Sequence, residues 1–187
     1  MPDRLYYTDN DEANRLLAED PAALLIGFVL DQQVPVQKAF VGPFVLRERL
    51  GTLDPARIAA TDPAELDRIF REKPAIHRFP GAMAERVQAL CAALAAEYDG
   101  DAARVWTEAA DAHDLERRLL ALPGIGPMKA RTLLAILGKQ FGVKPAGWDE
   151  VAPQHPTLGD VDSAESLAAY QAAKRAHKAE LRAAQAR

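Results

Sequence analysis

Apolar residues recur at three- and four-residue spacing along most of the chain, and this periodicity predicts helices. The pattern is clearest at 112–121 and 127–141, where leucines repeat on one face of each segment. Further helices are expected near 10–18, 21–31, 36–50, 55–60, 63–71, 80–98 and 163–185. No segment alternates apolar and polar residues with enrichment in β-branched side chains, so the predicted fold class is all-α.

Three Asp–Pro pairs indicate where helices begin. Asp20, Asp54 and Asp62 each precede a proline. An aspartate side chain accepts hydrogen bonds from free N–H groups of the first turn, and proline suits the first helical position. The stretch 143–160 is rich in proline and glycine, and is expected to be irregular or to hold one short helix around Trp148.

Composition excludes several classes of protein. The chain has 187 residues, 49% of them apolar, which suits one compact unit or two small lobes with a shared core. The single cysteine, Cys91, excludes a disulfide framework and an iron–sulfur cluster held by this chain's own thiolates. The four histidines lack metal-ligand spacing, so no transition-metal site is predicted. The apolar run at 22–30 is too short for a bilayer and the chain starts without signal-peptide features, which predicts a cytoplasmic protein with no membrane partner.

Charge is distributed unevenly along the chain. The formal net charge of −4 argues against a general polyanion binder but does not exclude one, because a local basic face matters more than the total. From Lys174 to the C-terminus there are five Lys or Arg residues against one acid, Glu180. This basic tail is either a set of auxiliary phosphate contacts or a solvated helix end.

The sequence LPGIG at 122–126 joins two predicted helices with two glycines where one would suffice. Gly124 and Gly126 allow unusual backbone conformations and leave N–H groups bare of side chains. Those groups lie at the start of the next helix, whose dipole favours an anion, and Lys129 and Arg131 add positive charge. A phosphate is the expected occupant, held without readout of base sequence. The alternative is an ordinary helix–helix corner with a glycine at its C-cap.

This segment resembles the hairpin of the helix-hairpin-helix base-excision DNA glycosylases, the superfamily of endonuclease III and the adenine glycosylases. The segments FVLDQQVPVQKA at 28–39 and RFPGAMAERVQALCAAL at 78–94 also resemble this family. The resemblance implies a two-lobed helix-hairpin-helix glycosylase fold. Its helical barrel lobe would span 21–141, and a second, reduced lobe would combine 1–20 with 142–187.

The resemblance implies a monomeric, nucleoid-associated DNA repair enzyme that removes a damaged or mispaired base from double-stranded DNA. A base inside a duplex must be flipped out before its glycosidic bond can be attacked. In the family a glutamine fills the gap, and the matching residue here is Gln33, with Gln32 beside it. From the residues alone both could be surface side chains at a helix end. The implied phosphate contacts are Leu122, Pro123, Gly124, Ile125, Gly126 and Lys129.

Cleavage of an N-glycosidic bond develops positive charge on the sugar, which a carboxylate can stabilise while it activates water. In the family this is an aspartate at the start of the helix after the hairpin's second helix. That distance leads to Ala146 here, so Asp149 is the nearest match, with Trp148 beside it as a wall of the base pocket. Its rivals are Asp162 and Asp160. From the residues alone, Asp149 is equally well explained as a solvated loop acid and Asp162 as a helix cap.

Bifunctional relatives carry a lysine that attacks the sugar, and its position is occupied here by Met128. The resemblance therefore implies a monofunctional glycosylase without lyase activity. Lys129 lies about 100° further around the helix, where a phosphate contact is expected.

Family hairpins also hold a monovalent cation through backbone carbonyls, which would belong here to Leu120, Leu122 and Ile125. No other cofactor is expected. Two alternatives remain open: a non-catalytic helix-hairpin-helix DNA-binding protein, and an all-α protein whose hairpin docks another protein.

Overall fold

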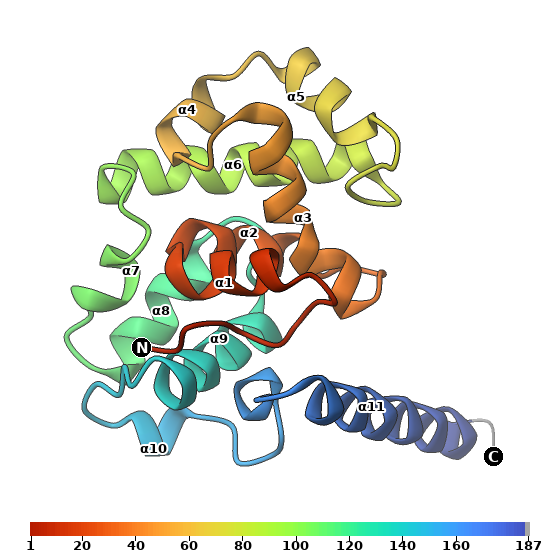
Figure 1. Cartoon of the computed structure of the whole chain (residues 1–187). Coiled ribbons are helices and arrows are strands. Elements are labelled where there is room, and N and C mark those ends of the chain that lie inside the picture. The colour runs from red at the N-terminus through yellow and green to blue at the C-terminus, as the bar shows by residue number, and fades with distance from the viewer. Residues whose placement is uncertain (186–187) are drawn as a thin grey trace.

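The computed structural model describes residues 1–185, and helices are the only regular secondary structure within that range (Figure 1). The longer helices are α1 (Asp11–Glu19), α2 (Pro21–Leu30), α3 (Val36–Leu50), α5 (Pro63–Arg71), α6 (Pro80–Tyr98), α8 (Ala112–Ala121), α9 (Pro127–Gln140) and α11 (Ala164–Gln185). The shorter ones are α4 (Pro55–Ala60), α7 (Arg104–Thr107), α10 (Trp148–Val151) and the 3-10 turn η1 (Leu158–Asp160). The predicted all-α fold class is confirmed.

The Asp–Pro pairs begin helices as predicted. The side chains of Asp20, Asp54 and Asp62 are the N-caps of α2, α4 and α5, and each accepts a hydrogen bond from a first-turn N–H group at 2.8–2.9 Å. The proline that follows each aspartate is the first residue of its helix. Capping by the preceding carboxylate therefore sets where these three helices start.

Helix α2 is the central element of the fold. All of its residues after Pro21 are buried, which is typical of a helix surrounded on every side. In Figure 1, α4, α5 and α6 lie above α2, and α8, α9 and α10 lie below it. Helix α3 packs directly on α2 and runs up to the upper group. Both ends of α2 therefore come near the surface between the two groups of helices.

One continuous cluster of buried apolar side chains extends from the N-terminal segment to the start of α11. It includes Leu5 and Tyr7 as well as Leu158 and Leu167. The Tyr7 hydroxyl donates a hydrogen bond to the Leu158 carbonyl at 2.8 Å, which joins the N-terminal segment directly to η1. The division into a lobe at 21–141 and a second lobe stays a prediction, and side chains from both parts share this cluster.

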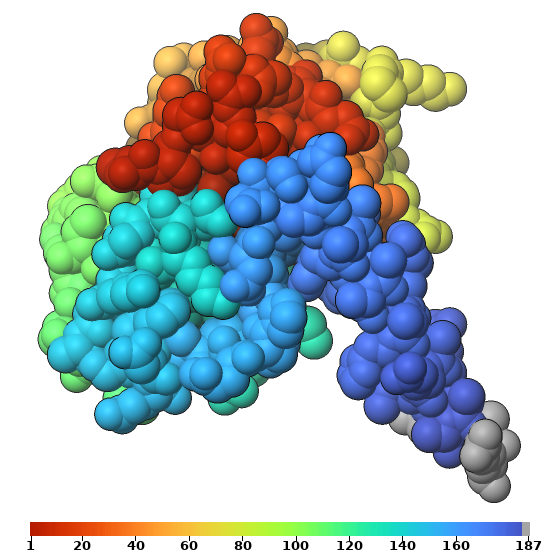
Figure 2. Space-filling model, turned by 60° about the horizontal axis from the view of Figure 1, so that its bottom comes forward, coloured from red at the N-terminus to blue at the C-terminus, as the bar shows by residue number. Residues whose placement is uncertain are grey.

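Helix α11 packs on the body only through its first turns. Leu167 is buried, and the amides of Gln171 and Gln37 of α3 exchange hydrogen bonds at 2.8 and 3.2 Å. From Ala172 to Ala184 every residue is exposed. Figure 2 shows the helix standing away from the body, with a notch between them. Among the described residues, no helix combines the length and apolar character needed to cross a membrane.

Candidate functional site

The hairpin between α8 and α9 has the backbone that its two glycines predict. Gly124 has a φ of +84°, in the left-handed region that glycine adopts without strain. The N–H of Ile125 donates to the Leu122 carbonyl at 3.1 Å and closes the turn. Gly126 is the N-cap of α9, and the space where its side chain would stand is open.

The first turn of α9 presents free hydrogen-bond donors. Within the described residues, the N–H groups of Gly126, Met128 and Lys129 have no hydrogen-bond partner. These donors stand at the positive end of the dipole of a fourteen-residue helix. Because Gly126 carries no side chain, an anion can approach them closely.

The hairpin rests on the last turn of α2. A side chain at Gly124 would place its first carbon 3.1 Å from Cγ2 of Val29. The linker between α2 and α3, residues 31–35, begins two residues after Val29. The hairpin and the segment that contains both glutamines are therefore neighbours in space.

The structure distinguishes the two glutamines of this linker. Gln32 is half-buried, and its side-chain oxygen accepts a hydrogen bond from Arg86 of α6. Gln33 is exposed, and its φ of +56° puts a non-glycine residue in the left-handed region. Such backbone strain is found preferentially at functional positions. Gln32 is thus tied to the protein, whereas the side chain of Gln33 is available to a partner.

The loop at 77–79 holds the linker from the other side. The ring of His77 is buried, and its Nε2 lies 3.1 Å from the carbonyl oxygen of Gln32. Its Nδ1 accepts a hydrogen bond from the N–H of Phe79 at 3.0 Å. Burial lowers the pKa of His77, which favours the neutral ring that this pair of contacts requires. Phe79 is 42% exposed, and the Arg78 guanidinium lies 4.8 Å from its ring centroid.

The three segments that resemble the glycosylase family therefore converge. The linker from 28–39 contacts the hairpin at 122–126 through Val29 and the segment 78–94 through Arg86. Along the chain, 38 residues separate the first segment from the second and 27 separate the second from the third, so the sequence alone could not show this meeting. The convergence defines the candidate site.

Cationic side chains differ in how freely they face this site. Lys129 is half-buried, its Nζ donates to the Gly124 carbonyl at 3.4 Å, and burial lowers its pKa. Nε of Arg131 lies 3.4 Å from Oε1 of Glu116 of α8, so this guanidinium is paired with a neighbouring helix. Met128 is 76% exposed in the first turn of α9. Lys129 is therefore the hairpin cation best placed for a phosphate.

Asp149 and Trp148 both belong to the short helix α10. The Asp149 side chain is exposed. The Trp148 indole is buried, donates to the Leu134 carbonyl at 3.0 Å, and fills the space above Gly138 of α9. This placement explains Trp148 as a core residue. Figure 1 shows α10 at the lower left, whereas α11 extends to the lower right.

Asp160 and Asp162 both precede α11, Asp160 as the last residue of η1. Asp160 completes a capping box with Thr157 and lies 2.6 Å from Nζ of Lys139. Burial alone would raise the pKa of Asp160, but the hydrogen bonds from Lys139 and Thr157 outweigh it and lower the pKa. Asp162 is exposed. Within the described residues, the side chains of Asp149, Asp160 and Asp162 make no hydrogen bond or ion pair with the hairpin or the linker.

The carboxylate that does lie at the convergence is Asp31, which sequence reasoning missed. It is the C-cap residue of α2 and is half-buried, and its side chain has no hydrogen bond or ion pair in the described part of the chain. Burial raises its pKa, while nearby Lys174 of α11 and Lys129 of α9 act in the opposite direction. The pKa of Tyr170 is raised by its own burial and also by the charge of Asp31.

The predicted cation site is made of carbonyl groups in the hairpin. The Leu122 carbonyl already accepts the N–H of Ile125, which leaves the carbonyls of Leu120 and Ile125 with more freedom to coordinate. The Lys129 ammonium already reaches the same turn at Gly124. The cation stays a prediction. Residues 1–185 contain no group of three or more His, Cys, Asp or Glu side chains arranged to hold a metal ion.

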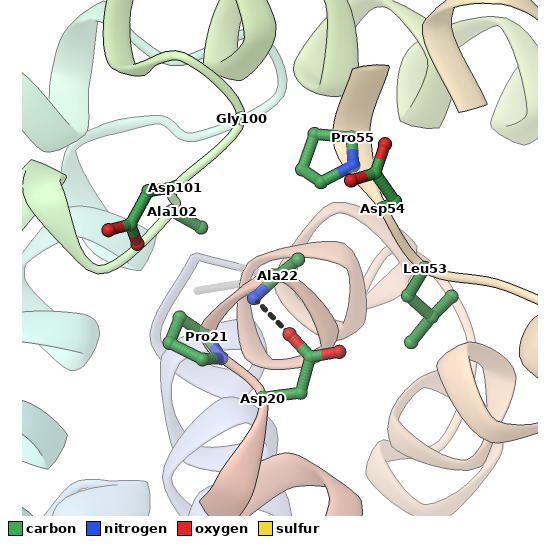
Figure 3. A pocket seen from close by; sticks show the side chains of 9 residues that line it. All are labelled: Asp20, Pro21, Ala22, Leu53, Asp54, Pro55, Gly100, Asp101 and Ala102. Carbon is green, nitrogen blue, oxygen red and sulfur yellow. Dashed lines mark hydrogen bonds between the residues drawn. The ribbon is translucent and has the colours of Figure 1, made fainter. Parts of the chain in front are cut away.

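A surface pocket of about 160 Å³ lies at the opposite end of α2. Three carboxylates line it, those of Asp20, Asp54 and Asp101 (Figure 3). Each accepts a backbone N–H at the start of a helix or turn, at 2.8–3.0 Å. All three carboxylates therefore act as structural caps. They do not make the pocket a second candidate for the functional site.

Comparisons with known proteins add no assignment. No protein-family model, curated protein or solved structure matches the chain. Function is therefore inferred from the residues that meet between the hairpin, the linker and α11.

Proposed function

We propose that this protein is a monofunctional DNA N-glycosylase that excises a damaged or mispaired base from double-stranded DNA. The observation that carries the proposal is the convergence of the hairpin, the Gln32–Gln33 linker and the loop before α6. By the resemblance, the hairpin grips the phosphate backbone and the linker fills the gap left by a flipped nucleotide. Their meeting on one surface is what a base-flipping enzyme requires.

The hairpin supplies the phosphate grip. Its free N–H groups at Gly126, Met128 and Lys129 point to binding of an anion at the helix N-terminus. The Lys129 ammonium adds a full positive charge beside them. Such contacts position a duplex and do not depend on its sequence.

Gln33 supplies the wedge. Flipping a nucleotide costs a few kcal/mol, and a side chain inserted into the stack offsets part of that cost. Gln33 is exposed on a strained linker and carries an amide that can pair with the base left behind. Gln32 then serves as the anchor, because Arg86 already holds its side chain.

The absence of an amine at Met128 supports hydrolysis without strand cleavage. Its exposed thioether cannot form a Schiff base with the sugar. Lys129 is directed to the Gly124 carbonyl, on a different face of α9. The expected product is an abasic site in an otherwise intact strand.

A second candidate function is a DNA-binding protein on the same scaffold without catalysis. The positions of Asp149, Asp160 and Asp162 favour it, since none of these side chains is bonded to the hairpin or the linker. The two functions differ in whether any base is released.

Base release is tested with duplexes that carry uracil, hypoxanthine, 8-oxoguanine, alkylated purines or mismatches. For at least one of them we expect strand breaks after alkali treatment and none without it. Breaks that form without alkali would contradict the monofunctional assignment. If no duplex yields product but all are bound, the non-catalytic function is correct.

Phosphate binding is tested with Gly126→Leu. The open space at Gly126 and its φ of −88° accept a side chain, so the fold should be unaffected while the bulk covers the free N–H groups. We expect duplex affinity to fall about tenfold or more, equivalent to about 1.4 kcal/mol, with an unchanged melting temperature.

The control is Ala110→Leu, which adds similar bulk at an exposed position before the start of α8. It should leave affinity unchanged. The parent should also lose affinity steeply with rising salt, because binding releases counterions from DNA. Equal affinity of Gly126→Leu and the parent, or salt-independent binding, would favour a protein-docking role instead.

A further inference from the structure

We propose that Asp31 is the catalytic carboxylate, and that it faces the sugar of a flipped 2′-deoxynucleotide bound between the hairpin, the Gln32–Gln33 linker and α11. This inference rests on the proposed function and assigns its chemistry to a residue outside the positions that the resemblance implies. Asp31 takes the place of Asp149, Asp160 and Asp162 as the carboxylate that stabilises the sugar cation and activates water.

Geometry is the first support. Asp31 lies where four elements meet: α2 ends there, the hairpin rests on Val29 two residues earlier, and the next residue, Gln32, is held by Arg86 of α6. Helix α11 closes the fourth side, through the paired amides of Gln171 and Gln37. The carboxylate is half-buried and has no partner among the described residues. An acid in this position is reachable from the surface that also presents Gln33.

The position of Asp31 on its helix is the second support. Its backbone N–H caps the Gly27 carbonyl, so its side chain stands at the C-terminal end of α2. The negative end of the helix dipole and the partial burial of the side chain both oppose a carboxylate there. A neutral side chain such as asparagine would suit this position better for folding, because it carries no charge for the helix dipole or burial to oppose. A charged side chain that lowers the stability of the fold is typical of a functional position.

The cations around Asp31 are the third support. Lys129 approaches from α9 and Lys174 from α11, both near enough to lower the pKa of Asp31 against the larger effect of burial. Tyr170 of α11 is near enough for the charge of Asp31 to raise its pKa, and Arg86 of α6 is near enough to Lys129 to lower the pKa of that lysine. Neither lysine forms an ion pair with Asp31 in the described structure. Both are therefore available to the phosphates on either side of a flipped nucleotide.

The chemistry is hydrolysis of the bond between C1′ and the base nitrogen. As that bond breaks, its electron pair leaves with the base, and positive charge develops on C1′ and the ring oxygen. The Asp31 carboxylate stabilises this charge and accepts a proton from the attacking water. The water oxygen bonds to C1′, the departing base takes up a proton from solvent, and Asp31 returns its proton to solvent. The burial that raises the pKa of Asp31 makes it a stronger base for this step.

The experiment compares full-length parent, Asp31→Asn, Asp149→Asn and a matched control. The control is Asp99→Asn, which removes the same charge from the C-cap of α6, where the left-handed backbone accepts asparagine. Each protein is assayed for single-turnover base release from the duplexes that the parent cleaves, for duplex affinity, and for melting temperature. We expect Asp31→Asn to lose at least about 100-fold in rate, with duplex affinity within a few-fold and a melting temperature unchanged or higher.

The outcomes separate this inference from the proposed function. If the parent releases bases and Asp31→Asn stays within about threefold of its rate, Asp31 is not the catalytic carboxylate and the glycosylase function stands. Loss of activity in Asp149→Asn alone would overturn the inference in the same way. Loss of activity together with a lowered melting temperature in Asp31→Asn would assign Asp31 a structural role. A parent that releases no base from any duplex overturns both proposals.

Discussion

The two ends of α2 carry the same side chain in opposite circumstances. Asp20, at the N-cap, accepts the N–H groups of Ala22 and Ala23 at 2.8 and 3.4 Å. Asp31, at the C-cap, accepts none among the described residues. Burial raises the pKa of both carboxyl groups. The fold fully explains Asp20, which satisfies free donors at the positive end of the dipole, whereas it gives Asp31 no partner at the negative end.

The largest effect that tests this comparison is on stability. Asp20→Ala removes the cap and should lower the free energy of unfolding by about 1–2 kcal/mol. Asp31→Ala should not lower it, because no favourable contact is lost. Urea denaturation monitored by circular dichroism measures both. The control is Asp20→Asn, which keeps an acceptor at the cap and should recover most of the loss. Equal losses for Asp20→Ala and Asp31→Ala would remove the distinction between the two ends.

A smaller effect is the pH dependence of the difference between the parent and Asp31→Asn. Because the pKa of Asp31 is raised in the folded state, folding binds a proton above the ordinary aspartate pKa of 3.8, and the parent loses stability as pH rises through this range. We expect Asp31→Asn to be more stable than the parent by about 0.3–1 kcal/mol at neutral pH. The difference should vanish below pH 3.8, where Asp31 is protonated in both states. A difference that stays constant from pH 3 to pH 7 would show that charge is not its cause.

The smallest effect concerns α11. Lys174 lowers the pKa of Asp31, so Lys174→Met should raise that pKa further and move the acidic limb of the kcat/KM profile to higher pH. On the acidic side of the optimum we expect a loss of at most about fivefold, since the two charges are partly solvated. Lys178→Met, one turn further along the exposed part of α11, should leave the limb in place. Identical pH profiles of kcat/KM for both variants would show that Lys174 does not influence the ionisation of Asp31.

Local signals in the sequence were sufficient for most of the helices. Each longer helix begins and ends within one residue of its expected position, since capping and apolar periodicity act over a few neighbouring residues. The segments α7 and η1 were not predicted, because four and three residues are too few to show a period. Trp148 was expected in a short helix, which α10 confirms, but its burial against Gly138 depends on α9.

The candidate site was predictable only where a segment carries its own signal. The two glycines of the hairpin and the paired glutamines are visible in the sequence, and the structure places both at the convergence. Asp31 was missed because what distinguishes it is supplied by α9 and α11, about 100 residues or more along the chain. Its one local signal was an acid directly after an apolar helix, at the end where the dipole opposes it.

The left-handed backbone of Gln33 also bears on the rate at which the protein would associate with the proposed DNA duplex. Holding a residue with a side chain in this conformation costs about 1–2 kcal/mol, and that cost is met when the chain folds. The glutamine is consequently presented outward before any partner arrives, so encounter needs no rearrangement of the linker. Pre-organisation of this kind favours rapid capture, because less conformational freedom is lost at the moment of contact.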